Sequence, residues 1–136
     1  MAVWGFGAYY LGESSPDKSQ EFLDNEYVCV GWSEEQAPAL HQMLRAIKVG
    51  DIVFIKSFAV KTKKLRIKAV GIVIDNACVV SGGLGTGIKV KWSKKYNPIE
   101  PIYITPEIYR NNVFKNSIYE EYNEEIIKKL VDAIMD

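Results

Sequence analysis

The chain has 136 residues, with 17 basic and 17 acidic side chains and a formal net charge of zero at pH 7. This length predicts one domain, 1–136, with a core large enough to fold without disulfides or metal ions. No stretch approaches the ~20 apolar residues of a membrane span, and the N-terminal segment lacks the basic and apolar regions of a signal peptide. We therefore expect a cytoplasmic protein with no membrane contact.

The first third of the chain predicts two strands and a helix. Ala2–Tyr10 and Tyr27–Trp32 are apolar and aromatic runs typical of strands, and residues 12–25 between them are polar, which predicts a loop with at most a short helical turn. Ser33 to Gln36 fits a capping box, but Pro38 is tolerated best at the first position of a helix. The pattern therefore predicts a helix over Pro38–Ile47.

The middle of the chain predicts further strands. The runs are Ile52–Ser57, apolar on both faces, Leu65–Asp75, and a hairpin, Val79–Trp92, around the glycine-rich turn Ser81–Gly87. Pro98 and Pro101 predict a break, because proline cannot donate a backbone hydrogen bond to a sheet. A short last strand is predicted at Ile102–Ile104.

The C-terminal third predicts two helices. Thr105 followed by Pro106 is a helix-start signal. Asn123 precedes Glu124 and Glu125, which predicts a capped helix with acids in its first turn. Its apolar stripe continues to Ile134, so the C-terminal helix is expected over about 123–135.

Known catalytic and metal-binding motifs are missing from the sequence. The segment Ser81–Gly87 has the glycine spacing of a phosphate loop, but Ile88 stands where that loop needs a lysine. No nucleophile elbow occurs, the two cysteines lie in separate apolar runs, and His41 is expected at the surface or at the boundary of the core. We therefore expect no metal, no cofactor and no catalytic residue, and a binding module rather than an enzyme.

The charges are unevenly distributed along the chain. Between residues 56 and 95 there are ten basic residues and one acid: Lys56, Lys61, Lys63, Lys64, Arg66, Lys68, Lys89, Lys91, Lys94 and Lys95, against Asp75. A local basic face is what binding to a phosphate backbone requires. Lysines also protect the exposed edges of strands, so the charge pattern leaves both interpretations open.

The aromatic residues are equally ambiguous. Trp4 and Tyr10 lie in the first predicted strand, and Trp32 and Trp92 each end a strand. A tryptophan in such a place is either a large core residue or a platform on which a nucleic-acid base stacks.

The order of these segments resembles a known family. A first aromatic strand is followed by Val28–Trp32 (VCVGW), then Lys48–Val53 (KVGDIV), Ala69–Val73 (AVGIV) and Ile88–Trp92 (IKVKW). This set is similar to the EVE-type branch of the PUA-like superfamily, and in particular to the EVE-like modules of modification-dependent restriction systems. It covers residues 2–92, and its sharpest motif is KVGDIV.

The resemblance implies an α+β fold, a small curved mixed β-barrel with helices packed on its outside. It also implies a non-catalytic module that reads a flipped, modified base of DNA or RNA in an aromatic pocket with a basic rim. The implied ligand-binding residues are Trp4, Tyr10, Trp32, Ser57, Phe58 and Trp92, and the ten basic residues would contact the nucleic acid. The alternative is a module that binds a nucleotide, another small molecule or a protein, and that originates from a phage or mobile element.

Overall fold

The computed structural model describes residues 1–10, 12–59, 64–103 and 117–135. In these residues the chain forms one six-stranded sheet with the strand order β2-β5-β4-β3-β1-β6. The strands are β1 (Val3–Gly7), β2 (Tyr27–Val30), β3 (Ile52–Ala59), β4 (Lys64–Ser81), β5 (Gly85–Tyr103) and β6 (Ile118–Glu120). Because β1 and β3 pair in parallel and the other neighbours are antiparallel, the sheet is mixed.

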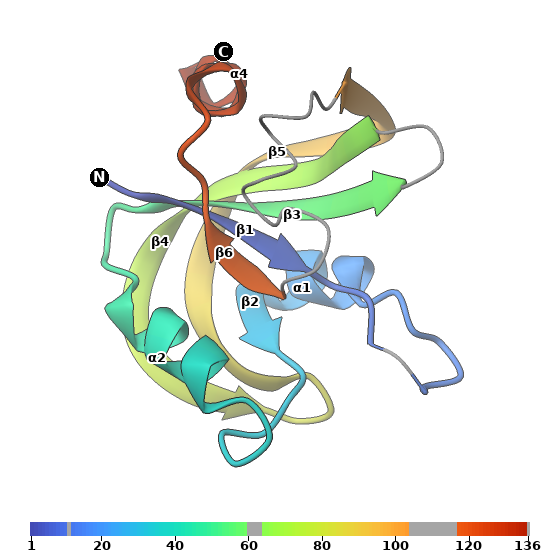
Figure 1. The fold of residues 1–136 in the computed structure, drawn as a ribbon, viewed down its shortest axis with the longest axis vertical. Coiled ribbons are helices and arrows are strands. Elements are labelled where there is room, and N and C mark those ends of the chain that lie inside the picture. The colour runs from blue at the N-terminus through green and yellow to red at the C-terminus, as the bar shows by residue number, and fades with distance from the viewer. Residues whose placement is uncertain (11, 60–63, 104–116, 136) are drawn as a thin grey trace.

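The two longest strands give the sheet its shape. β4 and β5 bend strongly along their length and curl the sheet into a half-barrel (Figure 1). Three described helices pack on the outside: α1 (Ser19–Asn25), α2 (Pro38–Ala46) and α4 (Glu124–Met135). The expected α+β fold, a small curved mixed barrel with external helices, is confirmed.

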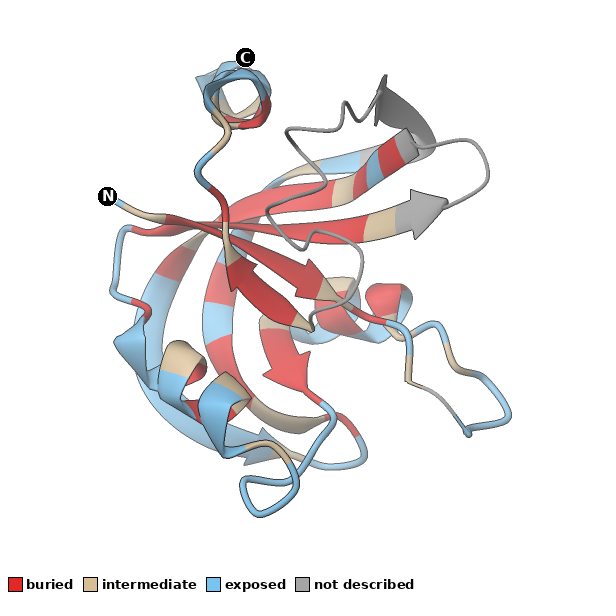
Figure 2. Ribbon diagram, in the orientation of Figure 1, coloured by how far each residue is buried: buried red, intermediate tan, exposed pale blue. Residues whose placement is uncertain are grey.

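The sheet buries apolar side chains on both faces. The concave face carries the larger core, which includes Trp4, Phe6 and Trp92. The convex face carries a second core, in which Phe54 and Tyr119 pack with Ile126 of α4. Figure 2 shows the result as buried residues running along β1, β3 and β6, with α4 exposing its outer side. Residues that alternate along one strand therefore serve two different cores.

The first helices differ in part from expectation. α1 is a full two-turn helix rather than a short turn, and it ends at Glu26 in the left-handed conformation (φ 57°). α2 begins at Pro38, as predicted. The Ser33 and Gln36 pair makes the reciprocal hydrogen bonds of a capping box, with N···O distances of 3.0 and 3.1 Å. It closes a separate turn just before the helix.

The prediction of a break at Pro98 and Pro101 is wrong. β5 continues to Tyr103 and stays paired with β4. The register jumps between Lys95, which pairs with Ala69, and Glu100, which pairs with Ile67, so the residues around Pro98 stand outside it. β2 pairs with β5 only as far as Lys89. Beyond that point β5 is an edge in the described sheet, where a missing N–H costs little.

The C-terminal part confirms the capped helix. Oδ1 of Asn123 accepts hydrogen bonds from the backbone N–H groups of Glu125 and Ile126, at 3.0 and 3.2 Å. Strand β6 was not expected from the sequence, and the helix predicted at Thr105 lies outside the described residues, as does Ile104. None of the helices in the described ranges has the length and apolar composition of a membrane-spanning segment.

A candidate binding site at a bulge in strand β4

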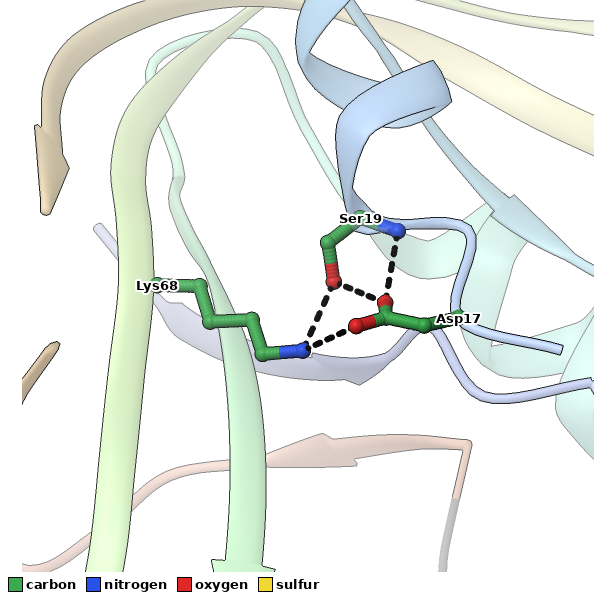
Figure 3. A network of polar contacts seen from close by, with 3 residues as sticks. All are labelled: Asp17, Ser19 and Lys68. Atoms are coloured by element: carbon green, nitrogen blue, oxygen red, sulfur yellow. Dashed lines mark hydrogen bonds and ion pairs between the residues drawn. The ribbon is translucent and has the colours of Figure 1, made fainter. Parts of the chain in front are cut away.

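Strand β4 contains a bulge at Lys68. Against β3, Ile67 pairs with Lys56 and Ala69 pairs with Ile55, so Lys68 has no partner in that register. The register against β5 shifts at the same place. A bulge of this kind bends the strand and redirects the side chain of the extra residue. Here it directs Lys68 toward the segment that leads into α1 (Figure 3).

Lys68 enters a compact polar network there. Its Nζ donates to Oδ2 of Asp17 at 2.9 Å and to Oγ of Ser19 at 3.1 Å. Oδ1 of Asp17 accepts from the backbone N of Ser19 at 3.0 Å and from its Oγ at 2.6 Å. Burial raises the pKa of Asp17, but the hydrogen bonds from Ser19 and Lys68 outweigh it and lower that pKa to about 2. The carboxylate therefore stays ionised at neutral pH.

An exposed aromatic side chain adjoins this network. Tyr9 forms an isolated antiparallel bridge with Asp17, and directly opposed residues project to the same side. Tyr9 is 65% exposed, so much of this residue is open to solvent. Sequence reasoning selected Tyr10 and missed Tyr9. The sequence offered only the alternation of side chains along the predicted strand, and alternation does not tell where the strand ends. The end of the strand decides which of the two tyrosines stays exposed.

More polar side chains share the concave face of the sheet beside Lys68. Ser57 follows Ile55 by two residues on β3 and lies opposite Arg66, and Lys95 lies opposite the concave-core residue Ala69. Arg66 and Lys95 are exposed, and Ser57 is half-buried. We call the whole set the bulge site: Tyr9, Asp17, Ser19, Ser57, Arg66, Lys68 and Lys95. It holds three cations and one acid.

The polar groups of Asp17, Ser19 and Lys68 at the bulge site are engaged with one another. Ser19 donates its hydroxyl proton to Asp17 and accepts a hydrogen bond from the Lys68 ammonium. The carboxylate that accepts this proton has a pKa of about 2, which makes it a weak base for activating Ser19 as a nucleophile. Within the described residues, no three histidine, cysteine or acidic side chains gather in the way that a metal ion requires. The site instead combines fixed cations with an exposed ring.

The three tryptophans do not share one environment. Trp4 and Trp92 are 6% and 8% exposed and belong to the concave core. Nε1 of Trp4 donates to Oδ2 of Asp51 at 3.0 Å, and Nε1 of Trp92 donates to the backbone O of Phe22 at 3.1 Å. Trp32 lies between β2 and α2 and is 48% exposed. The structure therefore places two of them in the core and leaves one accessible.

Tyr10 connects the segment after β1 to α1 and to the turn between β4 and β5. Its hydroxyl donates to the backbone O of Leu84, and its ring packs edge-on against Phe22 at 6.3 Å between centroids. A Cβ at Gly31 would come within 2.8 Å of the Tyr10 ring, so the glycine beside Trp32 allows this close approach. Burial, with Cys29 and Glu13 nearby, raises the pKa of Tyr10.

The basic residues are divided between the two faces of the sheet. Lys91 and Lys94 lie opposite Ile72 and Val70, which face the convex side, and Lys56 packs there over the Tyr119 ring. Lys89 is exposed two residues before Lys91 on the same strand. Lys61 and Lys63 lie outside the described residues, and only the backbone is described for Phe58 and Lys64. Of the described cations, Arg66, Lys68 and Lys95 lie at the bulge site.

His41 is buried, which contradicts the surface position, one of the two places expected for it. It is 4% exposed, and its Nε2 lies 2.7 Å from the backbone O of Trp32. Since a carbonyl oxygen can only accept, Nε2 must carry the proton. The helix turns His41 toward the loop after β2, a contact that periodicity within the helix cannot reveal. His41 thus anchors the backbone of the exposed Trp32.

Comparison with known proteins finds the fold in other organisms. The chain superposes on a hypothetical protein from Leishmania major with a TM-score of 0.60 and 13% identity, covering 98% of this chain and 94% of that one. Rpa0253 from Rhodopseudomonas palustris matches with a TM-score of 0.55 and 14% identity, over 98% and 92%. Atu2648 from Agrobacterium tumefaciens matches with 0.55 and 11%, over 98% and 93%. At such identities the likeness concerns the fold alone.

No family model matches the chain, and no curated protein matches its sequence. The residues of the bulge site therefore have to be interpreted from their own chemistry.

Proposed function

We propose that this protein is a non-catalytic nucleic-acid-binding module, PUA-like and of EVE type, that holds a strand of DNA or RNA at the bulge site. The observation that carries the proposal is the Asp17–Ser19–Lys68 network, in which Asp17 is bridged to the exposed Tyr9 and Lys68 lies on the same strand as the exposed Arg66 and next to the strand of the exposed Lys95. An open ring and fixed cations are the two elements that single-stranded nucleic-acid sites combine.

The cations supply the contacts to phosphate. Within the described part of the chain, Arg66 and Lys95 make no ion pair, whereas Lys68 is held by Asp17. Arg66 suits phosphate because its guanidinium presents paired donors. Two free cations on one concave face would give affinity that falls as salt rises, since each contact releases counterions.

The exposed aromatics supply the contacts to a base. Trp4 and Trp92 are buried and hydrogen bonded, so a cage of all three tryptophans is not the form that we propose. Stacking falls instead to Tyr9 at the bulge site, and Trp32 is also accessible. Base–aromatic stacking is worth about 1–3 kcal/mol per base. The base we expect is a modified one, taken out of its stack, as the family resemblance implies.

The test is a binding titration with short oligonucleotides that carry unmodified or modified bases, read by fluorescence anisotropy at 50 and 200 mM salt. We expect binding that weakens with salt, and a double variant, R66Q with K95Q, that binds more weakly and loses about 0.7 of salt slope per removed contact on a single strand. The matched control is K128Q with K129Q, which removes two exposed charges from α4. No binding at 50 mM salt, or equal loss in both double variants, would overturn the proposal.

A module for a free nucleotide is the second candidate. The observation that favours it is that Asp17 neutralises Lys68, which leaves only Arg66 and Lys95 as unpaired cations in the described part of the site. Two cations are enough for one small phosphorylated ligand. The same titration distinguishes the candidates, because a mononucleotide would then bind as tightly as an oligonucleotide.

A further inference from the structure

The hydrogen-bonding capacity of the bulge network is not fully used. An ionised carboxylate offers about four acceptor positions and an ammonium three donors. Asp17 accepts two hydrogen bonds at Oδ1, both from Ser19, and one at Oδ2, from Lys68. Among the described residues, Nζ of Lys68 donates to Asp17 and to Ser19. One acceptor position on Oδ2 and one donor on Nζ remain, on atoms 2.9 Å apart (Figure 3).

This remaining pair is accessible and held in place. The side chain of Asp17 is 54% exposed and that of Lys68 is 20% exposed. Asp17 is fixed by Ser19, which is 8% exposed, and by the bridge to Tyr9. Lys68 is fixed by the bulge that separates Ile67 from Ala69 in both registers. A binding group needs little further ordering when its own supports are buried.

An acceptor beside a donor is also what the side-chain amide of asparagine or glutamine presents to adenine, where it accepts from the amine and donates to a ring nitrogen. The ion pair presents the same two groups with full charges, which strengthens each hydrogen bond. Tyr9 on the same side offers a ring on which the base can stack.

We propose that Asp17 and Lys68 together read the edge of a nucleic-acid base that has an exocyclic amine next to an acceptor nitrogen, as in adenine, cytosine and those modified forms of them that keep an amine hydrogen. Oδ2 of Asp17 accepts from the amine and Nζ of Lys68 donates to the ring nitrogen. The inference rests on the proposed function, because a base has to reach the site, and it names the residues that select the base. On a Watson–Crick edge these atoms are free only when the base is unpaired.

The test compares three single-stranded oligonucleotides that differ at one central base: adenine, N6,N6-dimethyladenine and an abasic position. The dimethylated base keeps its ring but has no amine hydrogen to donate. With the unaltered protein, we expect adenine to bind about tenfold more tightly than dimethyladenine, the discrimination typical of one good bidentate contact. This arm needs no variant, so it stands even if substitutions at the network disturb α1.

The variant D17N supplies the second arm, because the amide keeps the shape of the carboxylate and loses its charge. We expect the preference for adenine over dimethyladenine to fall to less than threefold, while the salt slope set by Arg66 and Lys95 is retained. D24N is the matched control, an exposed acid of α1 whose Oδ1 accepts from the Gln20 side chain at 2.9 Å.

The outcomes separate the two proposals. Salt-dependent binding of all three oligonucleotides with equal affinity would overturn the reading of the base edge and leave the nucleic-acid-binding function standing. An unchanged preference in D17N would assign the selection to other residues and would also overturn the inference. Absence of binding to every oligonucleotide would overturn both.

Discussion

Trp4 donates its indole N–H to Oδ2 of Asp51 across 3.0 Å, and this contact joins the first strand to the turn before β3. The same carboxylate accepts from the backbone N of Lys48 at 3.0 Å and, through Oδ1, from the backbone N of Ala2 at 3.1 Å. Asp51 is 5% exposed. The KVGD segment is therefore a structural clamp, with Gly50 at φ 93° forming the turn that only glycine adopts easily.

We predict that D51A lowers the free energy of unfolding by about 2–4 kcal/mol, because it leaves the buried Trp4 donor without a partner and removes hydrogen bonds to a charged group. Urea unfolding at pH 7 measures the change. D132A, at an exposed position of α4, is the control and should stay within about 0.5 kcal/mol of the unaltered protein. Equal stabilities of D51A and D132A would contradict the clamp.

Asp51 also makes stability depend on pH. Burial raises its pKa, but the hydrogen bonds from Lys48, Ala2 and Trp4 outweigh it and hold that pKa below the ordinary 3.8. A carboxyl whose folded pKa is depressed stabilises the fold above its unfolded pKa, and this contribution is lost as the pH falls through the folded value. The free energy of unfolding that the protein loses as the pH falls below 4 should therefore be smaller in D51N.

Lys56 makes stability depend on pH in the alkaline range. It is 9% exposed, its Nζ lies 5.7 Å from the centroid of the Tyr119 ring, and it has no ion-pair partner in the described residues. Burial lowers its pKa from 10.5 to about 8. Between these two values the unfolded chain binds a proton that the folded chain does not, so stability rises with pH. Below pH 8 the buried charge costs up to about 3 kcal/mol.

K56M should therefore be more stable than the unaltered protein at pH 7, by about 1–3 kcal/mol, and the gain should shrink as the pH approaches 9.5. Thermal unfolding at both pH values measures it. K129M changes an exposed lysine of α4 in the same way and should show neither effect. A loss of stability in K56M at pH 7 would mean that the contact with Tyr119 outweighs the cost of burial.

Local signals in the sequence predicted those elements that local chemistry determines. Pro38 begins α2, and Asn123 caps α4, because both act within one turn of the chain. The pairing of β5 around Pro98, in contrast, is not determined by local chemistry. Proline reads as a break, yet the strand continues because one side of it has no neighbour in the described sheet beyond Lys89. Whether an edge is free depends on strand order, which a local pattern does not contain.

The candidate site was predictable only in part. The excess of cations in the middle of the chain was visible, but alternation along β4 and β5 sends them to opposite faces, and the bulge at Lys68 shifts that alternation by one residue. Asp17 lies in a segment that reads as a polar loop, and its partner is 51 residues away. Composition can show that charges cluster in sequence, whereas the bulge determines which of them meet.

The tryptophans give a prediction that separates core from surface. W92A should lower the free energy of unfolding by about 3–5 kcal/mol, because it leaves a cavity in the concave core and removes the hydrogen bond to Phe22. W32A removes a side chain that is 48% exposed and should cost less than about 1 kcal/mol. Urea unfolding followed by circular dichroism measures both. Similar losses would show that Trp32 is needed for folding and does not serve only as an accessible ring.

The two cysteines should react very differently with a thiol reagent. Cys78 is exposed near the tip of the β4–β5 hairpin, whereas Cys29 is 1% exposed in the concave core. Burial raises the pKa of the Cys29 thiol to about 12, so almost none of it is the reactive thiolate at pH 8. A Cβ at Gly87 would lie 2.5 Å from Sγ of Cys29, which shows how tightly the neighbouring strand packs on it.

We therefore expect one thiol of the folded protein to react with the reagent within minutes at pH 8. The second should react only when urea unfolds the chain. C78S should abolish the fast phase and leave the slow one, whose rate then reports the opening of β2 from β5. If global unfolding exposes Cys29, the rate of this slow phase should be lower in a more stable protein, such as one that also carries K56M. Two fast thiols in the folded protein would contradict the packing of Cys29 against Gly87, and with it the closed pairing of β2 that supports Trp32.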